Sequence, residues 1–130
     1  MKNEKQLQTI RLLRKSALIV LSVIGILLLA FSLFSGSEAY GGGLAGIVKN
    51  SPNSLPWIVL VMAIFIAWRR DIWGGFLITI FGGVITYFFN FTGGNFFLIT
   101  FVVCLLIVFL GLVVLFSGLA LKNLAAHNKV

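Results

Sequence analysis

Four long apolar runs constrain what this chain can fold into. The first, residues 16–34, has 19 residues without a charged side chain. At 1.5 Å per residue, an α-helix of that length crosses the ~30 Å hydrocarbon layer of a bilayer. The second run begins at residue 55, but its helix is expected to start near residue 52, because proline is tolerated in a first helical turn. We therefore predict four transmembrane spans, over residues 16–34, 52–68, 72–89 and 96–121.

The composition excludes an ordinary soluble domain. Of the 130 residues, 60% are hydrophobic and only 10% are charged, whereas soluble domains are about 25% charged. The chain has room for four spans and their connections, but not for a catalytic domain beside them. The expected fold class is all-α, a polytopic membrane protein with an antiparallel four-transmembrane-helix bundle. Its parts are a basic N-terminal segment (1–15), the bundle (16–121) and a tail (122–130).

The ten basic residues are distributed unevenly along the chain. Five precede the first run, two lie between the second and third runs, two lie in the tail, and Lys49 lies apart from them. An inside N-terminus places nine of them in the cytoplasm, as the positive-inside rule requires. Trp68 and Trp73 flank the inner connection, while Trp57 and Tyr87 lie near the opposite face, and such rings prefer headgroup depth. We expect a multi-pass protein of the cell membrane with both termini in the cytoplasm.

A secretory signal is the alternative interpretation of the first run. Basic residues precede the run, and Ser37, Glu38 and Ala39 follow it with small residues at the spacing of a cleavage site. The run is longer than the roughly 7 to 15 residues of a signal core, so an uncleaved span is favoured. A mature N-terminus at Tyr40 would leave three spans.

The connection between the second and third runs is a short charged hairpin, Trp68-Arg69-Arg70-Asp71-Ile72. Cations suit the C-terminal end of the second helix, and Asp71 is predicted to be the N-cap of the third. An Arg–Asp pair within the hairpin would be exposed to solvent and worth at most about 1 kcal/mol. We therefore interpret the hairpin as a topological anchor that makes the two spans antiparallel neighbours.

The N-terminal segment places Leu7, Ile10 and Leu13 at intervals of three. Basic side chains accompany them: Lys5, Arg11, Arg14 and Lys15. This pattern is typical of a basic amphipathic helix on an anionic leaflet. Fixing the orientation of the chain explains the same residues more simply, and we favour that interpretation.

Small and hydroxyl residues recur at helical spacings within three of the runs, which puts them on single helix faces. Because helices in lipid associate through close packing, we predict that these faces point into the bundle. The alternative is a hydroxyl-lined permeation path through Thr79, Thr86 and Thr100. The small-residue stripes are Gly75, Thr79, Gly82 and Thr86, with Gly74 and Gly83 beside them, in the third run; Cys104, Gly111 and Gly118 in the fourth; and Gly25 and Ser32 in the first.

The two outer connections are predicted to be irregular. Residues 35–54 contain Gly41-Gly42-Gly43 and several apolar side chains, which favours a flexible or interfacial loop. Residues 90–95 are expected to form a turn, with Gly93 and Gly94 ending one helix and Asn95 capping the next.

The spans lack the groups that most membrane chemistry requires. No Asp, Glu, Lys, Arg or His lies inside any of them, which argues against a proton-coupled transporter. Cys104 is the single cysteine and His127 the single histidine, so neither is expected to complete a metal site or a nucleophile pair. We predict a non-enzymatic protein with no catalytic, cofactor-binding or metal-binding residues and no cofactor.

The hairpin run Ala67-Trp68-Arg69-Arg70-Asp71-Ile72-Trp73-Gly74-Gly75-Phe76, preceded by Leu55-Pro56-Trp57, supports a comparison. In these residues the chain resembles small bacterial four-span membrane proteins grouped as domains of unknown function. In that group a Trp-basic hairpin joins the second span to a glycine-bearing third span. The resemblance implies a four-span architecture and no particular activity.

Two classes of function remain open. The first is a structural or accessory membrane protein that contacts membrane lipid and forms a homo-oligomer or binds a larger membrane-protein partner. The second is a small oligomeric channel or passive transporter, whose path would form between subunits. Because the basic residues do not form a surface with aromatic side chains among them, we expect no nucleic-acid partner.

Overall fold

A computed structural model describes residues 2–127, which are almost entirely helical. The long helices are α1 (Lys2–Phe34), α3 (Leu55–Arg69), α4 (Asp71–Phe91) and α5 (Leu98–His127). Between α1 and α3 lie two 3-10 turns, η1 (Glu38–Tyr40) and η2 (Ser51–Ser54), and the short helix α2 (Gly43–Asn50). Within the described residues, four helical stretches are long and apolar enough to cross a membrane: Glu4–Tyr40, Gly43–Arg69, Asp71–Phe91 and Leu98–His127.

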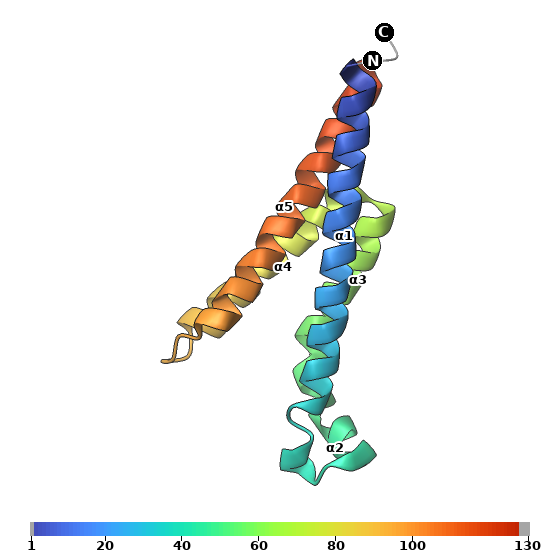
Figure 1. The fold of residues 1–130 in the computed structure, drawn as a ribbon. Helices are drawn as coiled ribbons and strands as arrows, with labels where there is room; N and C mark the ends of the chain where they lie inside the picture. Colours follow the sequence, from blue (N-terminus) through green and yellow to red (C-terminus); the bar gives the residue numbers. More distant parts are fainter. Residues whose placement is uncertain (1, 128–130) are drawn as a thin grey trace.

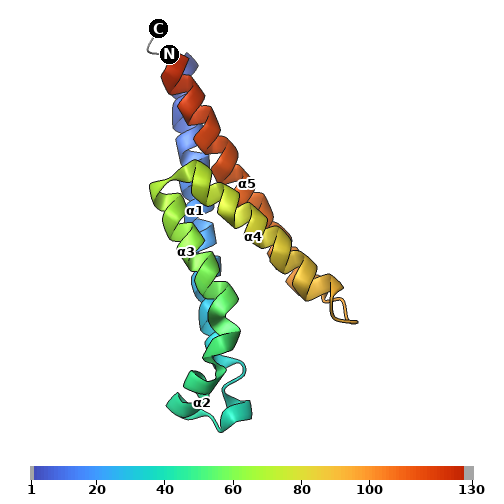
Figure 2. The ribbon, with the colours of Figure 1, turned by 180° about the vertical axis from the view of Figure 1, so that it is seen from behind.

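The long helices form two arms that meet at one end and diverge at the other (Figure 1). The first arm is α1 packed against α3, with α2 at its tip; the second is α4 packed against α5. Figure 2 shows from behind that α3 and α5 separate along their length, so the helices are not gathered into one parallel-sided bundle. We call the end where the arms meet the inner end, and the open end the outer end, after the sides expected from the charges.

The inner end extends beyond the α3–α4 turn as a pair of helices. The start of α1 and the end of α5 lie side by side there and share a groove lined by both. The basic segment 2–15 is therefore the beginning of α1 and no separate element, because it contains no glycine or proline to interrupt a helix. Leu7 and Ile10 are half-buried, whereas Leu13 is exposed. Met1 of the predicted segment and residues 128–130 of the predicted tail lie outside the described residues.

The first outer connection is more regular than predicted, and the second, residues 92–97, is irregular but lies two residues further along the chain than predicted. Residues 35–54 hold α2 and both 3-10 turns, so the expected flexible loop is mostly helical. At the second connection α4 continues to Phe91, and Asn90 is a buried residue of this helix. Asn95 is not the cap of the next helix, because α5 begins only at Leu98.

The small-residue stripes lie where the helices approach most closely, as predicted. A Cβ atom on Gly74 would lie 2.1 Å from the Cα of Ala67, so α3 and α4 are in backbone contact beside their turn. A Cβ on Gly75 would lie 2.5 Å from the backbone nitrogen of Leu115 in α5. Close approach recurs between α4 and α5 at Gly82, Gly111 and Gly118, whereas a Cβ on Gly25 of α1 would meet only side chains of α3. Gly83 is the exception: it is exposed, and its Cβ position meets nothing within 4 Å.

Candidate functional site

An ion pair joins α1 to α4 at the inner end. The Nε atom of Arg14 lies 2.9 Å from Oδ1 of Asp71, and both side chains are largely shielded, with 28% and 21% exposed. Asp71 is not the N-cap of α4: it is the first residue of the helix, and Arg70 occupies the cap position. The carboxylate therefore pairs with α1 and not within the hairpin. A Cβ on Gly118 would lie 2.8 Å from the Cβ of Asp71, so α5 completes this junction.

Below the junction, α1 and α3 form a narrow apolar groove of about 170 Å³, which we call the inner groove. Two of its lining side chains are joined by a hydrogen bond, in which Nε1 of Trp68 donates to Oγ of Ser22 at 3.1 Å. The Arg69 guanidinium lies over the ring of Phe65, 5.3 Å from its centroid. The lining residues are Ser22, Ile26, Val61, Ile64, Phe65 and Trp68.

Between the two arms lies a larger opening of about 590 Å³, which we call the outer cleft. It takes side chains from both arms and mixes apolar with small polar groups. The rings of Trp57 and Phe89 stack across it, with centroids 5.9 Å apart and planes within 5° of parallel. The lining residues are Leu28, Phe31, Ser32, Ser35, Asn53, Trp57, Phe89, Ile99, Thr100, Val103 and Cys104.

A buried asparagine organises the outer end of the first arm. Nδ2 of Asn50 donates to the carbonyl oxygens of Ser32 and Leu33 at 2.8 and 3.0 Å. These carbonyls belong to the last turn of α1, where no helical N–H remains to bond them. Oδ1 of Asn50 accepts a hydrogen bond from Nδ2 of Asn53, and Gly36 leaves the room that the asparagine fills. Asn50 is not identified in the sequence analysis. The one available signal is the end of the first apolar run, because the last carbonyl groups of a helix need hydrogen-bond donors from elsewhere.

The hydroxyl groups of the alternative permeation path do not act together. Thr79 donates to the carbonyl oxygen of Gly75 at 2.8 Å, and Thr86 donates to that of Gly82 at 2.6 Å. Both hydroxyl protons are thus used within α4. Thr100 instead lines the outer cleft, on another helix.

Cys104 and His127, which the sequence analysis does not expect to be reactive, lie far apart from each other in α5. Cys104 is a buried free thiol at the outer cleft, and His127 is exposed in the last turn of α5. Among residues 2–127, no three His, Cys, Asp or Glu side chains are grouped so that they could hold a metal ion. The openings described above are an apolar groove between α1 and α3 and a cleft of mixed polarity between the two arms.

Comparison with known proteins places this architecture in a family without a described activity. No curated protein and no solved structure matches the chain. The resemblance to proteins of unknown function is confirmed in that respect, since residues 3–126 match one such family over nearly the full length. The chain belongs to the family described as Domain of unknown function (DUF7670).

Proposed function

We propose that this chain is an integral protein of the cell membrane, with four spans and cytoplasmic termini, that serves as an accessory subunit for a larger membrane protein. Its role is non-enzymatic: it receives a transmembrane helix of its partner in the outer cleft. The observation that carries the proposal is the cleft itself, which is open between two arms and lined from both. In lipid, helices gain little from the hydrophobic effect, so small and hydroxyl-bearing surfaces such as this one are what association uses.

The lining of the outer cleft suits a helix better than it suits polar solutes. Phe31 and Ile99 are 70% and 81% exposed and stand at its edges. Ser35, Asn53 and Thr100 add groups that can exchange hydrogen bonds with a partner backbone or side chain. Charged side chains, which usually mark ion and substrate pathways in membranes, are missing from this lining.

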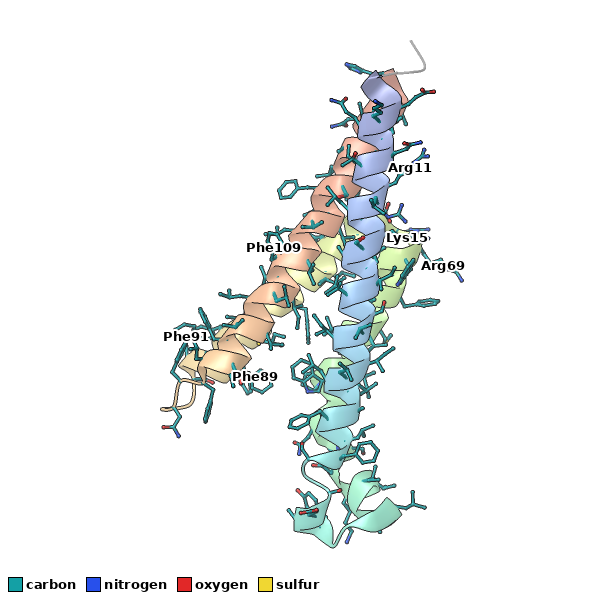
Figure 3. The ribbon with its side chains drawn as sticks, viewed as in Figure 1. Arg11, Lys15, Arg69, Phe89, Phe91 and Phe109 are labelled. Carbon is teal, nitrogen blue, oxygen red and sulfur yellow. The ribbon has the colours of Figure 1, made fainter. Side chains whose placement is uncertain are left out.

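Photo-crosslinking tests the proposal. Benzoylphenylalanine placed at Phe31 should crosslink one defined membrane protein in native membranes. The control is the same group at Phe109, which is also well exposed but lies on the far side of α5 (Figure 3). If the adduct instead contains a second copy of the chain, the outer cleft is the interface of a homo-oligomer and the proposed partner is contradicted. Solute flux into liposomes that hold the purified chain alone, with no adduct at position 31, would overturn the accessory role in favour of a pore.

Cysteine labelling tests the orientation. In intact cells, a membrane-impermeant maleimide should label the Lys49→Cys variant and leave the Lys122→Cys variant unlabelled until the membrane is opened. The wild-type chain is the blank, because its one cysteine is buried. Labelling of Lys122→Cys in intact cells would contradict cytoplasmic termini.

A further inference from the structure

The two walls of the inner groove continue into basic residues at its inner end. On α1, Ser22 and Ile26 line the groove, and Lys15 and Arg11 extend the same face at spacings of seven and four. On α3, Val61 and Phe65 line the groove, and Arg69 follows Phe65 by four residues. Each stripe therefore runs from an apolar middle to a cationic end.

The cations of the two stripes follow one another in depth. Nε1 of Trp68 donates to Oγ of Ser22, so Trp68 is level with the middle of the α1 stripe. Arg69 therefore stands outward of Lys15, which is itself outward of Arg11. Figure 3 shows Arg11, Lys15 and Arg69 projecting to the same side of the molecule. All three are exposed, and Asp71, the carboxylate beside them, is already paired with Arg14. Among residues 2–127, no ion pair to any of these three cations is found, so positive charge is concentrated at the inner end of an apolar groove.

We propose that the inner groove and its three cations bind one anionic glycerophospholipid of the inner leaflet. Arg11, Lys15 and Arg69 hold the headgroup phosphate, and an acyl chain lies along Phe65 and Ile26. The groove volume of about 170 Å³ leaves room for part of an acyl chain, since a cavity of roughly 150 Å³ already accepts a benzene ring. Trp68, with its indole N–H turned to Ser22, sits where such rings mark the edge of the hydrocarbon layer.

This site depends on membrane insertion but not on the partner proposed for the outer cleft, so the purified chain tests it alone. In native mass spectrometry from detergent, the chain should retain phosphatidylglycerol in preference to phosphatidylcholine of the same acyl composition. The Lys15→Gln, Arg69→Gln double variant should lose this preference, with retention weakened about tenfold or more, because each basic residue near an anionic surface contributes appreciably. The matched control is Lys49→Gln, Lys122→Gln, which removes the same charge elsewhere and should bind as the wild type does.

A second pair of variants examines the apolar half of the site. Ile26→Trp fills the groove without changing the charge and should reduce retention of phosphatidylglycerol. Leu27→Trp, at a neighbouring residue of similar exposure that does not line the groove, should not. Equal retention of both lipids by the wild type, or equal losses in the two double variants, would overturn the proposed site.

Discussion

Arg14 and Asp71, which are far apart in the chain, form the ion pair that fixes where the two arms meet. The pair is held at 2.9 Å between Nε and Oδ1, and the close approach of Gly118 shields its other side. It places the start of α4 against α1, although most of α4 packs against α5. The hairpin, which the sequence analysis interprets as a topological anchor, is thus itself held in place by α1.

The first prediction concerns the energy of this pair. Arg14→Gln and Asp71→Asn should each lower the free energy of unfolding in detergent by about 1 to 2 kcal/mol, because the pair is mostly shielded yet still touches solvent. A double-mutant cycle should give a coupling energy of about 1 kcal/mol. Arg70→Gln is the control, since Arg70 is exposed and lies beside the pair without joining it. If the change in unfolding free energy of the double variant equals the sum of the two single changes, the two residues are not coupled.

The second prediction compares two adjacent glycines of α4. A Cβ on Gly82 would lie 2.8 Å from Cγ2 of Val108 and 3.1 Å from its backbone nitrogen, whereas one on Gly83 meets nothing. Gly82→Leu should therefore separate α4 from α5 and cost about 1 to 3 kcal/mol by overpacking. Gly83→Leu should leave stability unchanged or raise it. Chemical unfolding in detergent measures the stability of both variants. Equal stability would contradict the conclusion that Gly82, and not Gly83, faces α5.

The third prediction concerns the cap at the outer end of α1. Asn50→Ala removes a buried hydrogen bond to the carbonyl oxygen of Ser32 and a partly buried one to that of Leu33, and an unpaired buried polar group costs about 1 to 3 kcal/mol. Hydrogen exchange should accelerate in α2 and in the last turn of α1, while α4 and α5 keep their protection. Ser51→Ala, at the exposed neighbouring residue, is the control. Unchanged exchange in α2 after Asn50→Ala would rule out this anchoring role.

The elements of this fold that follow from local pattern could be predicted from the sequence. The apolar runs place the ends of α3 and α4 closely, whereas α1 begins well before its run, at Lys2, and α5 continues past its run to His127. The spacing from Gly75 to Gly82 identifies the face of α4 that meets α5. Gly83 was included in the same face, but a helix turns about 100° per residue, which directs it outward. Family membership adds no activity to this result.

The features that depend on distant segments could not be predicted. The partner of Asp71 is Arg14. The sequence does not indicate this pair, because Arg69 and Arg70 lie next to Asp71 in the chain and are the more obvious partners. Asn50 becomes important only when α2 folds back on the end of α1. The divergence of the arms leaves no trace in the periodicity, because large apolar side chains cover the exposed faces of these helices as well as the packed ones. The outer cleft follows from that divergence.

The fourth prediction tests what holds the outer ends of the arms together. Trp57 and Phe89 stack across the outer cleft, and such a pair contributes about 0.5 to 1.5 kcal/mol. Because this stack bridges the two arms, Trp57→Leu should widen the cleft and broaden its distribution of widths. Spin labels at Val48→Cys and Phe97→Cys, in a Cys104→Ala background, report the distance between the arms by pulsed electron resonance. Trp73→Leu, at a more exposed ring away from the cleft, should leave the distribution as it is. Identical distributions in the Trp57→Leu variant and its parent would mean that the stack does not restrain the arms, and the restraint would then have to come from the inner junction alone.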